Sequence, residues 1–215
     1  MKKDHFGLLA ATMTVTAMFS LLLWIAPLVQ PLASTQKIVA IGVGVLTSSG
    51  VYRLIASTLY ELFQRILVVR RLLLGRNFLE GTWVGFYVHH GQPRYTVEFF
   101  DQESGELKVS GREFDSSGKT RIGWESYACN IDDASDRLIY SYSCDIYAVS
   151  TQRQGIGVFK LLRTHKRKAA RALDGYSADL IDGKKDPNFE HKVSDKRIPD
   201  AEALFKAQEI FGKRT

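Results

Sequence analysis

The sequence predicts a protein of two parts, in which two membrane-spanning helices precede an all-β domain that ends in a helix. Three observations support this organisation: two long apolar runs near the N-terminus, a change to two-residue periodicity after Glu80, and a helical pattern at the C-terminal end. Helices and strands place side chains on one face at different spacings, so a change of period marks a change of structure. We expect residues 1–77 to form a transmembrane hairpin with a juxtamembrane helix, and residues 78–215 to form a cytoplasmic domain.

Each N-terminal run is long enough to cross a bilayer. Phe6–Val29 and Ile38–Tyr60 each supply roughly the 20 apolar residues that a spanning helix needs. Of the Lys and Arg residues before residue 77, only Lys37 lies between the runs, Arg53 lies within one or two turns of the outer end of the second run, and the others flank the outer ends of the pair. The positive-inside rule then predicts that both ends face the cytoplasm and that Gln30–Lys37 forms a short external loop.

The charge of the remaining chain argues against DNA or RNA as a partner. The chain carries 29 Lys and Arg, 23 Asp and Glu, and a formal net charge of +6. Residues 1–76 hold eight of the basic and two of the acidic residues, which leaves 21 of each in the β domain. Non-specific nucleic-acid binding depends on an excess of positive charge, and this domain has none. The cysteines, Cys129 and Cys144, match no metal site, and we expect them to be reduced strand residues.

Alternating apolar and polar residues predict a series of short strands after Glu80. Turn signals rich in Gly, Pro, Asp and Ser separate the segments, and one of these predicted turns is Gln152–Gly155. Hairpin-length links favour an antiparallel up-and-down β-barrel of about eight strands over a sandwich. The predicted strands are Gly81–His89, Arg94–Asp101, Glu106–Asp115, Thr120–Ile131, Arg137–Tyr147, Gly155–Arg163, Arg171–Asp182 and, as a short eighth strand, Phe189–Val193.

The C-terminal segment has the features of an amphipathic helix. Pro199 suits its first turn, the acidic Asp200 and Glu202 favour its N-terminus, and Gly212 suits its end. We expect its apolar side to pack against the barrel rather than the membrane. That side consists of Leu204, Phe205, Ala207, Ile210 and Phe211.

The strand faces suggest an aromatic interior. In a strand, alternate residues share a face, which groups Trp83, Gly85, Tyr87 and His89; Trp124, Ser126 and Ala128; Tyr140 and Tyr142; and Phe159 and Leu161. Aromatic rings that also carry hydrogen-bonding groups can stack on a flat base and fix its edge. Aromatic residues also fill the core of any small barrel, and the sequence leaves both interpretations open. Candidate phosphate contacts are Arg94, Arg121, Arg153, Lys160 and Arg163.

Catalysis is not expected, because the sequence has no recognisable enzymatic motif. His89 and His90 point to opposite faces of a strand, so they do not chelate one metal in a simple way. Gly155-Ile156-Gly157 precedes a strand rather than a helix, which is wrong for a dinucleotide-cofactor fingerprint. We therefore predict a binding protein with no metal and no cofactor.

Two apolar spans followed by Gly81-Thr82-Trp83-Val84-Gly85-Phe86-Tyr87 resemble a family of bacterial antiphage proteins. These are the CBASS (CD-NTase-associated) effectors with two transmembrane helices and a β-strand-rich domain, the SMODS-associating 2TM β-strand-rich effector family. Further matching features are Gly111–Asp115 with Gly118, Trp124 with Ser126, Tyr140 with Tyr142, Gly157 with Phe159, and Gly175-Tyr176 with Asp179.

The resemblance implies a membrane effector that detects a cyclic dinucleotide. A functionally linked CD-NTase would make this ligand upon phage infection, and the cytoplasmic barrel would bind it. Binding would drive homo-oligomerisation, and the clustered helices would disrupt the lipid of the bacterial inner membrane. On this hypothesis Trp83, Tyr87, Trp124 and Tyr142 stack on bases, and Arg94 and Arg153 contact phosphates.

Two other functions fit the sequence. A membrane-anchored, lipocalin-like barrel would bind a lipid or another hydrophobic ligand, and aliphatic side chains would line its cavity. A structural anchor would instead recruit a protein partner through Val84, Phe86 and Val88, which share the other face of the first strand.

Overall fold

The computed structural model describes residues 11–20, 23, 34–89, 91–102, 106–147, 149, 151–181 and 183–212, and of residues 34–49 it describes the backbone. The chain divides into two compact units, Met1–Leu73 and Leu74–Thr215. The predicted boundary between residues 77 and 78 falls just beyond this division.

The described part of the first unit is helical. Residues 11–20 form a helix, and α2 (Ser34–Arg65) and α3 (Leu67–Leu74) follow. The predicted segment Ile38–Tyr60 lies wholly within α2, so its helical structure is confirmed. Of Phe6–Val29 only residues 11–20 and 23 are described, and the start of the predicted external loop also lies outside the described residues. Over the described segments, no helix combines the length and apolar composition that a membrane crossing requires, so the two predicted spans are not confirmed.

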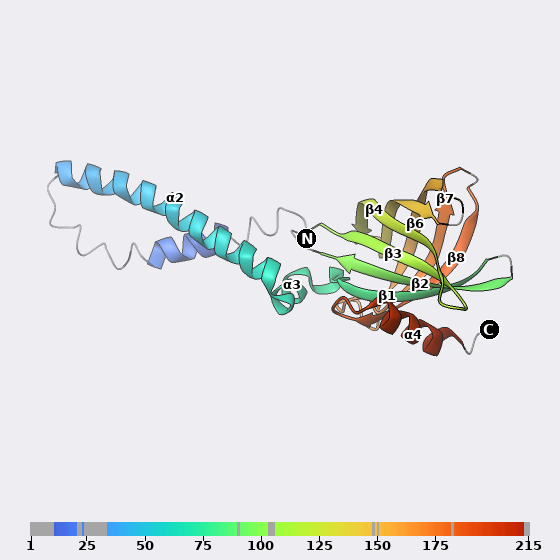
Figure 1. Ribbon diagram of the computed structural model, residues 1–215. Helices are drawn as coiled ribbons and strands as arrows, with labels where there is room; N and C mark the ends of the chain where they lie inside the picture. Colours follow the sequence, from blue (N-terminus) through green and yellow to red (C-terminus); the bar gives the residue numbers. More distant parts are fainter. Residues whose placement is uncertain are drawn as a thin grey trace. The chain divides into compact units, whose positions relative to one another are not determined.

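Eight antiparallel strands close into an up-and-down barrel in the second unit (Figure 1). Each strand pairs with its neighbours in sequence, and β1 closes the barrel by pairing with β8. The predicted barrel is confirmed, and the sandwich is excluded. The strands are β1 (Gly81–His89), β2 (Gln92–Asp101), β3 (Lys108–Asp115), β4 (Thr120–Asp132), β5 (Arg137–Ile146), β6 (Thr151–Leu162), β7 (Ala172–Asp179) and β8 (Lys185–Ser194).

The predicted turn at Gln152–Gly155 is wrong. These residues lie inside β6, where Gln152 pairs with Asp145 and Gly155 pairs with Tyr142 of β5. Glycine is common in turns, but Gly155 is required here for packing inside a strand. A Cβ atom at this position would overlap the Tyr142 ring, so the glycine leaves room for an inward-facing aromatic side chain.

A β-bulge in β4 corrects the predicted face of Ala128. The register with β5 shifts between Ser126 and Ala128, so the inward face changes from even to odd residue numbers at this point. Ser126 lies before the shift, and its hydroxyl accepts a hydrogen bond from the Val109 backbone N–H at 2.7 Å. Cys129 packs against the interior core after the shift, whereas Ala128 is exposed.

One end of the barrel interior is filled by a hydrophobic core. Trp83 is fully buried there, stacks on Phe100 with ring centroids 5.1 Å apart, and donates its indole N–H to the Leu79 carbonyl at 2.8 Å. Other members of this core are Val109, Leu138, Tyr140, Phe159, Leu161, Ala170 and Leu173. This end of the barrel is therefore closed, and space for a ligand lies toward the other end.

Helix α4 (Asp200–Phe211) covers the outer face of β1 and β2, as Figure 1 shows. Ala203, Ala207 and Phe211 are buried in a second hydrophobic cluster with Val84 and Val97. The predicted packing of the tail helix is confirmed, although Phe205 is 66% exposed and faces away from the barrel.

The α4 packing also corrects the third functional interpretation. Val84 is fully buried, and Phe86 packs against the same cluster. Neither side chain is available to recruit a protein partner, and only Val88 of the three is exposed.

Candidate functional site: a polar cavity at the open end of the barrel

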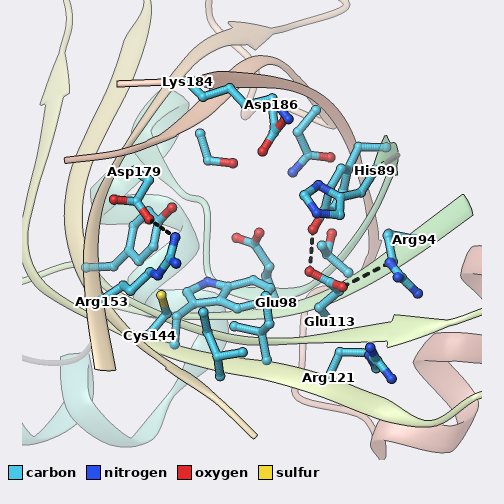
Figure 2. A pocket seen from close by; sticks show the side chains of 18 of the residues that line it. His89, Arg94, Glu98, Glu113, Arg121, Cys144, Arg153, Asp179, Lys184 and Asp186 are labelled. Carbon is cyan, nitrogen blue, oxygen red and sulfur yellow. Dashed lines mark hydrogen bonds and ion pairs between the residues drawn. The ribbon is translucent and has the colours of Figure 1, made fainter. Parts of the chain in front are cut away.

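The barrel holds a cavity of about 610 Å³, which Figure 2 shows from close by, and Trp83 is not among its lining residues. This volume falls within the range of about 300–1,000 Å³ that is typical of small-molecule sites. All eight strands contribute inward-facing side chains. The lining residues are Tyr87, His89, Arg94, Thr96, Glu98, Glu113, Arg121, Ile122, Trp124, Tyr140, Tyr142, Cys144, Ile146, Val149, Arg153, Ser177, Asp179, Lys184, Asp186 and Asn188.

The aromatic side chains of the cavity lie over glycines on the next strand. Gly111 of β3 pairs with Trp124 of β4, and Gly155 of β6 pairs with Tyr142 of β5. A Cβ atom at Gly111 would overlap the indole ring, and one at Gly155 would overlap the phenol ring. The pattern of aromatic residue opposite glycine therefore fixes where two flat surfaces lie in the cavity wall.

Two arginines of the cavity are paired with carboxylates. Arg94 Nε lies 3.3 Å from Glu113 Oε1, and Arg153 Nη1 lies 3.0 Å from Asp179 Oδ2, as Figure 2 shows. The Tyr87 hydroxyl donates a short hydrogen bond to the same Glu113 carboxylate. These pairs hold the arginines in place, and a guanidinium has five N–H donors, so each retains donors for a bound anion.

Among the described residues of the lining the formal charges balance, with four cationic and four acidic side chains. The cations are Arg94, Arg121, Arg153 and Lys184, and the acids are Glu98, Glu113, Asp179 and Asp186. Burial raises the pKa of Glu98 to about 7. Burial also raises the pKa of Glu113, although the Tyr87 hydrogen bond and the Arg94 charge lower it in part. Near neutral pH the lining therefore carries less negative charge than the formal count suggests.

The aromatic hydroxyls of the cavity stay protonated. Burial and the neighbouring Glu113 charge raise the pKa of Tyr87, and burial together with the Cys144 charge raises that of Tyr142. Both phenols therefore keep their proton at physiological pH, and Tyr87 donates its proton to Glu113. Among the described residues, no group of His, Cys, Asp and Glu side chains has the arrangement of a metal site.

Five of the six predicted site residues line the cavity: Tyr87, Arg94, Trp124, Tyr142 and Arg153. Trp83 does not, because it lies in the core of the closed end. Alternation along β1 places Trp83 on the inward face, but it does not tell how deep in the barrel a residue lies.

Of the other candidate phosphate contacts, Arg121 lines the cavity. Lys160 is exposed, and it alternates with the inward-facing Phe159 and Leu161. Arg163 lies at the other end of β6 from Arg153, where its Nε atom is 3.2 Å from Asp136 Oδ1 and its side chain is 4% exposed. That side chain holds the closed end together rather than lining the cavity.

The sequence interpretation missed the carboxyl, hydroxyl and amide groups deep in the cavity, namely Glu98, Thr96 and Asn188. A signal was present in β2, where the polar Arg94, Thr96 and Glu98 alternate with apolar residues. Such a strand would ordinarily turn its apolar face toward the interior. In β2 the apolar face lies under α4 instead, so the polar face lines the barrel.

Comparisons with known proteins identify no family. No protein-family model matches the chain, and no curated protein matches it. A solved structure described as "The Siderocalin Ex-FABP functions through dual ligand specificities" is 14% identical, with a TM-score of 0.31, over 63% of this chain and 85% of that chain. A likeness at this level supports no argument about function, so the functional proposal depends on the cavity.

Proposed function

We propose that the barrel is a receptor for a small polar molecule with a planar ring, and that a cyclic dinucleotide is its ligand. The observation that carries this proposal is the lining of the cavity, in which aromatic rings and guanidinium groups face one enclosed space. Trp124 and Tyr142 offer surfaces for base stacking, and Arg94, Arg121 and Arg153 offer donors to phosphate.

The charge distribution supports a ligand that carries both negative charge and hydrogen-bond donors. Its phosphates would take the spare donors of Arg94 and Arg153, which the Glu113 and Asp179 carboxylates hold in position. Its bases would exchange hydrogen bonds with the polar groups between the rings. A wholly apolar ligand would leave those groups buried and unpaired, at a cost of about 1–3 kcal/mol each.

The remaining parts of the proposal rest on the sequence. The apolar N-terminal runs and their basic flanks support an anchor in the bacterial inner membrane, and the resemblance supports a role in antiphage defence. On this proposal the ligand drives homo-oligomerisation and the helices then disrupt the membrane. The ligand must bind the assembled state more tightly than the resting state, because equal affinity for both shifts no equilibrium. We propose binding rather than catalysis.

A lipid or another hydrophobic molecule is the second candidate ligand. Eight-stranded barrels are wide enough to hold one small ligand. Some of the side chains in the links between strands of this barrel are aliphatic. Val149 lies in the link before β6 and lines the cavity, and Leu180 and Ile181 in the link before β8 are exposed. Against this candidate, Ile122, Ile146 and Val149 are the only aliphatic side chains among the lining residues that the structure describes.

Extraction of the full-length protein after purification from its host separates the two candidates. Mass spectrometry of the extract is expected to detect a cyclic dinucleotide in protein taken from infected cells, and no stoichiometric lipid beyond the detergent belt. A fatty ligand that is lost upon substitution of a cavity residue would instead support the lipid carrier.

A further inference from the structure

The deepest part of the cavity concentrates oxygen atoms that accept hydrogen bonds. Glu98 and Thr96 of β2 are 1% and 3% exposed, and Asn188 and Glu190 of β8 are equally enclosed at 7% and 0%. Strand β1 lies between β2 and β8, and its Gly85 pairs with both Thr96 and Glu190. The side chains from the two outer strands therefore meet above a residue that has no side chain. We call these four side chains the cavity floor.

The close fit around Gly85 shows how the floor is formed. A Cβ atom there would overlap Thr96 Oγ1, and it would lie 2.9 Å from Glu190 Cγ and 3.0 Å from Asn188 Oδ1. Any other residue at this position would push the oxygen atoms apart. Figure 2 shows Glu98 in the middle of the cavity, with its carboxylate directed into the space between the labelled charged residues.

Three oxygen atoms of the floor lack a donor among the described residues. Thr96 Oγ1, Asn188 Oδ1 and Glu190 Oε2 are buried and have no hydrogen-bond partner there. Asn188 donates an Nδ2–H to Glu190 Oε1 at 3.0 Å. This hydrogen bond fixes the orientation of the amide and leaves Oδ1 as its atom without a partner. The Tyr140 hydroxyl lies 3.5 Å from Glu98 Oε2, and the Glu98 carboxyl also interacts with the neighbouring Glu190 carboxyl. Buried acceptors without donors are costly, so they indicate a group that supplies donors when it is bound.

We propose that the cavity floor binds a planar group with two adjacent N–H donors, such as the Watson–Crick edge of guanine or an amidine, with Glu98 as the main acceptor. Above pH 7, where Glu98 is mostly ionised, its carboxylate can accept two parallel N–H bonds, which the N1–H and N2–H of guanine present at the right spacing. The edge of adenine presents an acceptor nitrogen beside its amino group, and that nitrogen would face the Glu98 oxygens. This inference rests on the proposed function only in placing the donor group on the base of a cyclic dinucleotide.

The test compares cyclic di-GMP with cyclic di-IMP by calorimetry on the full-length chain in detergent. The two ligands differ only in the exocyclic amino group of each base. We expect cyclic di-GMP to bind about ten-fold more tightly, since one hydrogen bond to a charged group is lost in the other ligand. The Glu98→Gln variant should bring the ratio close to one. The control Glu125→Gln removes an exposed carboxylate from β4 and should leave the ratio unchanged.

A second variant covers the case in which Glu98→Gln fails to fold. Thr96→Val replaces an unpartnered buried hydroxyl by a methyl group, so we expect it to keep or raise the melting temperature and still to reduce the preference for cyclic di-GMP. An unchanged ratio in a folded Glu98→Gln variant overturns the inference. If Glu98→Gln does not fold, equal preference in wild type and Thr96→Val overturns it.

Benzamidine tests the floor without a nucleotide. It carries two adjacent N–H donors on a planar ring and no phosphate, and it should raise the melting temperature of the wild type but not that of Glu98→Gln. If benzamidine protects while no cyclic dinucleotide binds, the floor inference stands and the proposed ligand class is wrong. If cyclic dinucleotides bind without a preference for guanine, or cyclic di-AMP binds most tightly, the proposed function stands and the floor inference is wrong. If neither benzamidine nor cyclic di-GMP interacts with the floor, the inference is likewise overturned.

Discussion

Trp124 is the side chain whose substitution separates stacking from general packing. Its ring lies in the cavity wall over Gly111. Tyr127, three residues further along the chain, is 61% exposed. We expect Trp124→Leu to weaken binding of the tightest cyclic dinucleotide by about 1–3 kcal/mol, the usual contribution of one stacked base. Calorimetry measures this loss. Tyr127→Leu is the matched control, and equal losses in the two variants would contradict a stacking role.

Arg153 tests the phosphate contact in the same way. It lines the cavity from β6, and Lys160 of the same strand is exposed. We expect Arg153→Gln to weaken binding by about ten-fold or more, since a charge-assisted hydrogen bond is lost, and to reduce the salt dependence of the affinity. Titrations at two salt concentrations measure both effects. Lys160→Gln should change neither, and an Arg153→Gln variant with wild-type affinity and salt dependence would exclude this contact.

The buried carboxyl pair at the floor makes folding stability depend on pH. Burial raises the pKa of Glu98 from 4.5 to about 7, and burial and the Glu98 charge raise that of Glu190 further. The folded protein therefore binds more protons than the unfolded chain in this range, so the stability due to the neutral pair is complete below pH 4.5 and is lost as the pH rises through about 7.

The Glu98→Gln variant should lack the contribution of Glu98 to the pH dependence of folding stability. Relative to the variant, the ligand-free wild type is expected to lose about 3 kcal/mol of unfolding free energy between about pH 4.5 and pH 8. Chemical denaturation at a series of pH values measures the difference between the two proteins. Parallel curves would show that Glu98 titrates as an exposed carboxyl does.

Helix α4 shows how one element directs the polar face of β2 into the barrel. Phe211 is fully buried, with its ring against Phe86 of β1 and Phe189 and His191 of β8, and Phe205 of the same helix is 66% exposed. We expect Phe211→Ala to lower the unfolding free energy by about 3 kcal/mol and Phe205→Ala to change it by less than about 0.5 kcal/mol. Thermal and chemical denaturation measure both. Equal effects would mean that α4 does not pack as described.

Periodicity accounts for how much of the fold the sequence predicts. The bounds of β1 were predicted without error, and the closed eight-stranded order follows from hairpin-length links. The errors occur where the same residue pattern is compatible with two local structures. Gly155 lies inside a strand beneath Tyr142, although glycine also marks turns, and the bulge after Ser126 reverses the face of Ala128. Neither effect is visible without the partner strand.

The same limit applies to the candidate site. Alternation placed Tyr87 and Trp124 correctly on the inward face, but it gave no depth for Trp83. The floor was missed because Thr96 and Glu190 are far apart in sequence and meet only when β1 pairs with both of their strands. Such a site forms only when the barrel closes, and the residue pattern of a single strand carries no information about which strands will be its neighbours.

At the scale of the whole molecule, the proposal joins a ligand-binding barrel to a helical unit, Met1–Leu73. Ligand binding is proposed to favour an assembled state, so the addition of a saturating cyclic dinucleotide should increase the mass of the full-length protein in detergent. Light scattering after size-exclusion chromatography measures this, and Trp124→Leu is expected to need more ligand for the same shift. Ligand that binds with no change in mass would separate recognition from assembly.

Calorimetric titration of the full-length protein with a panel of cyclic dinucleotides tests the central claim most directly. The cavity is predicted to give saturable binding to at least one member of the panel, with competition between members for the same site. An absence of binding to every member would contradict the claim that this barrel is a cyclic-dinucleotide receptor.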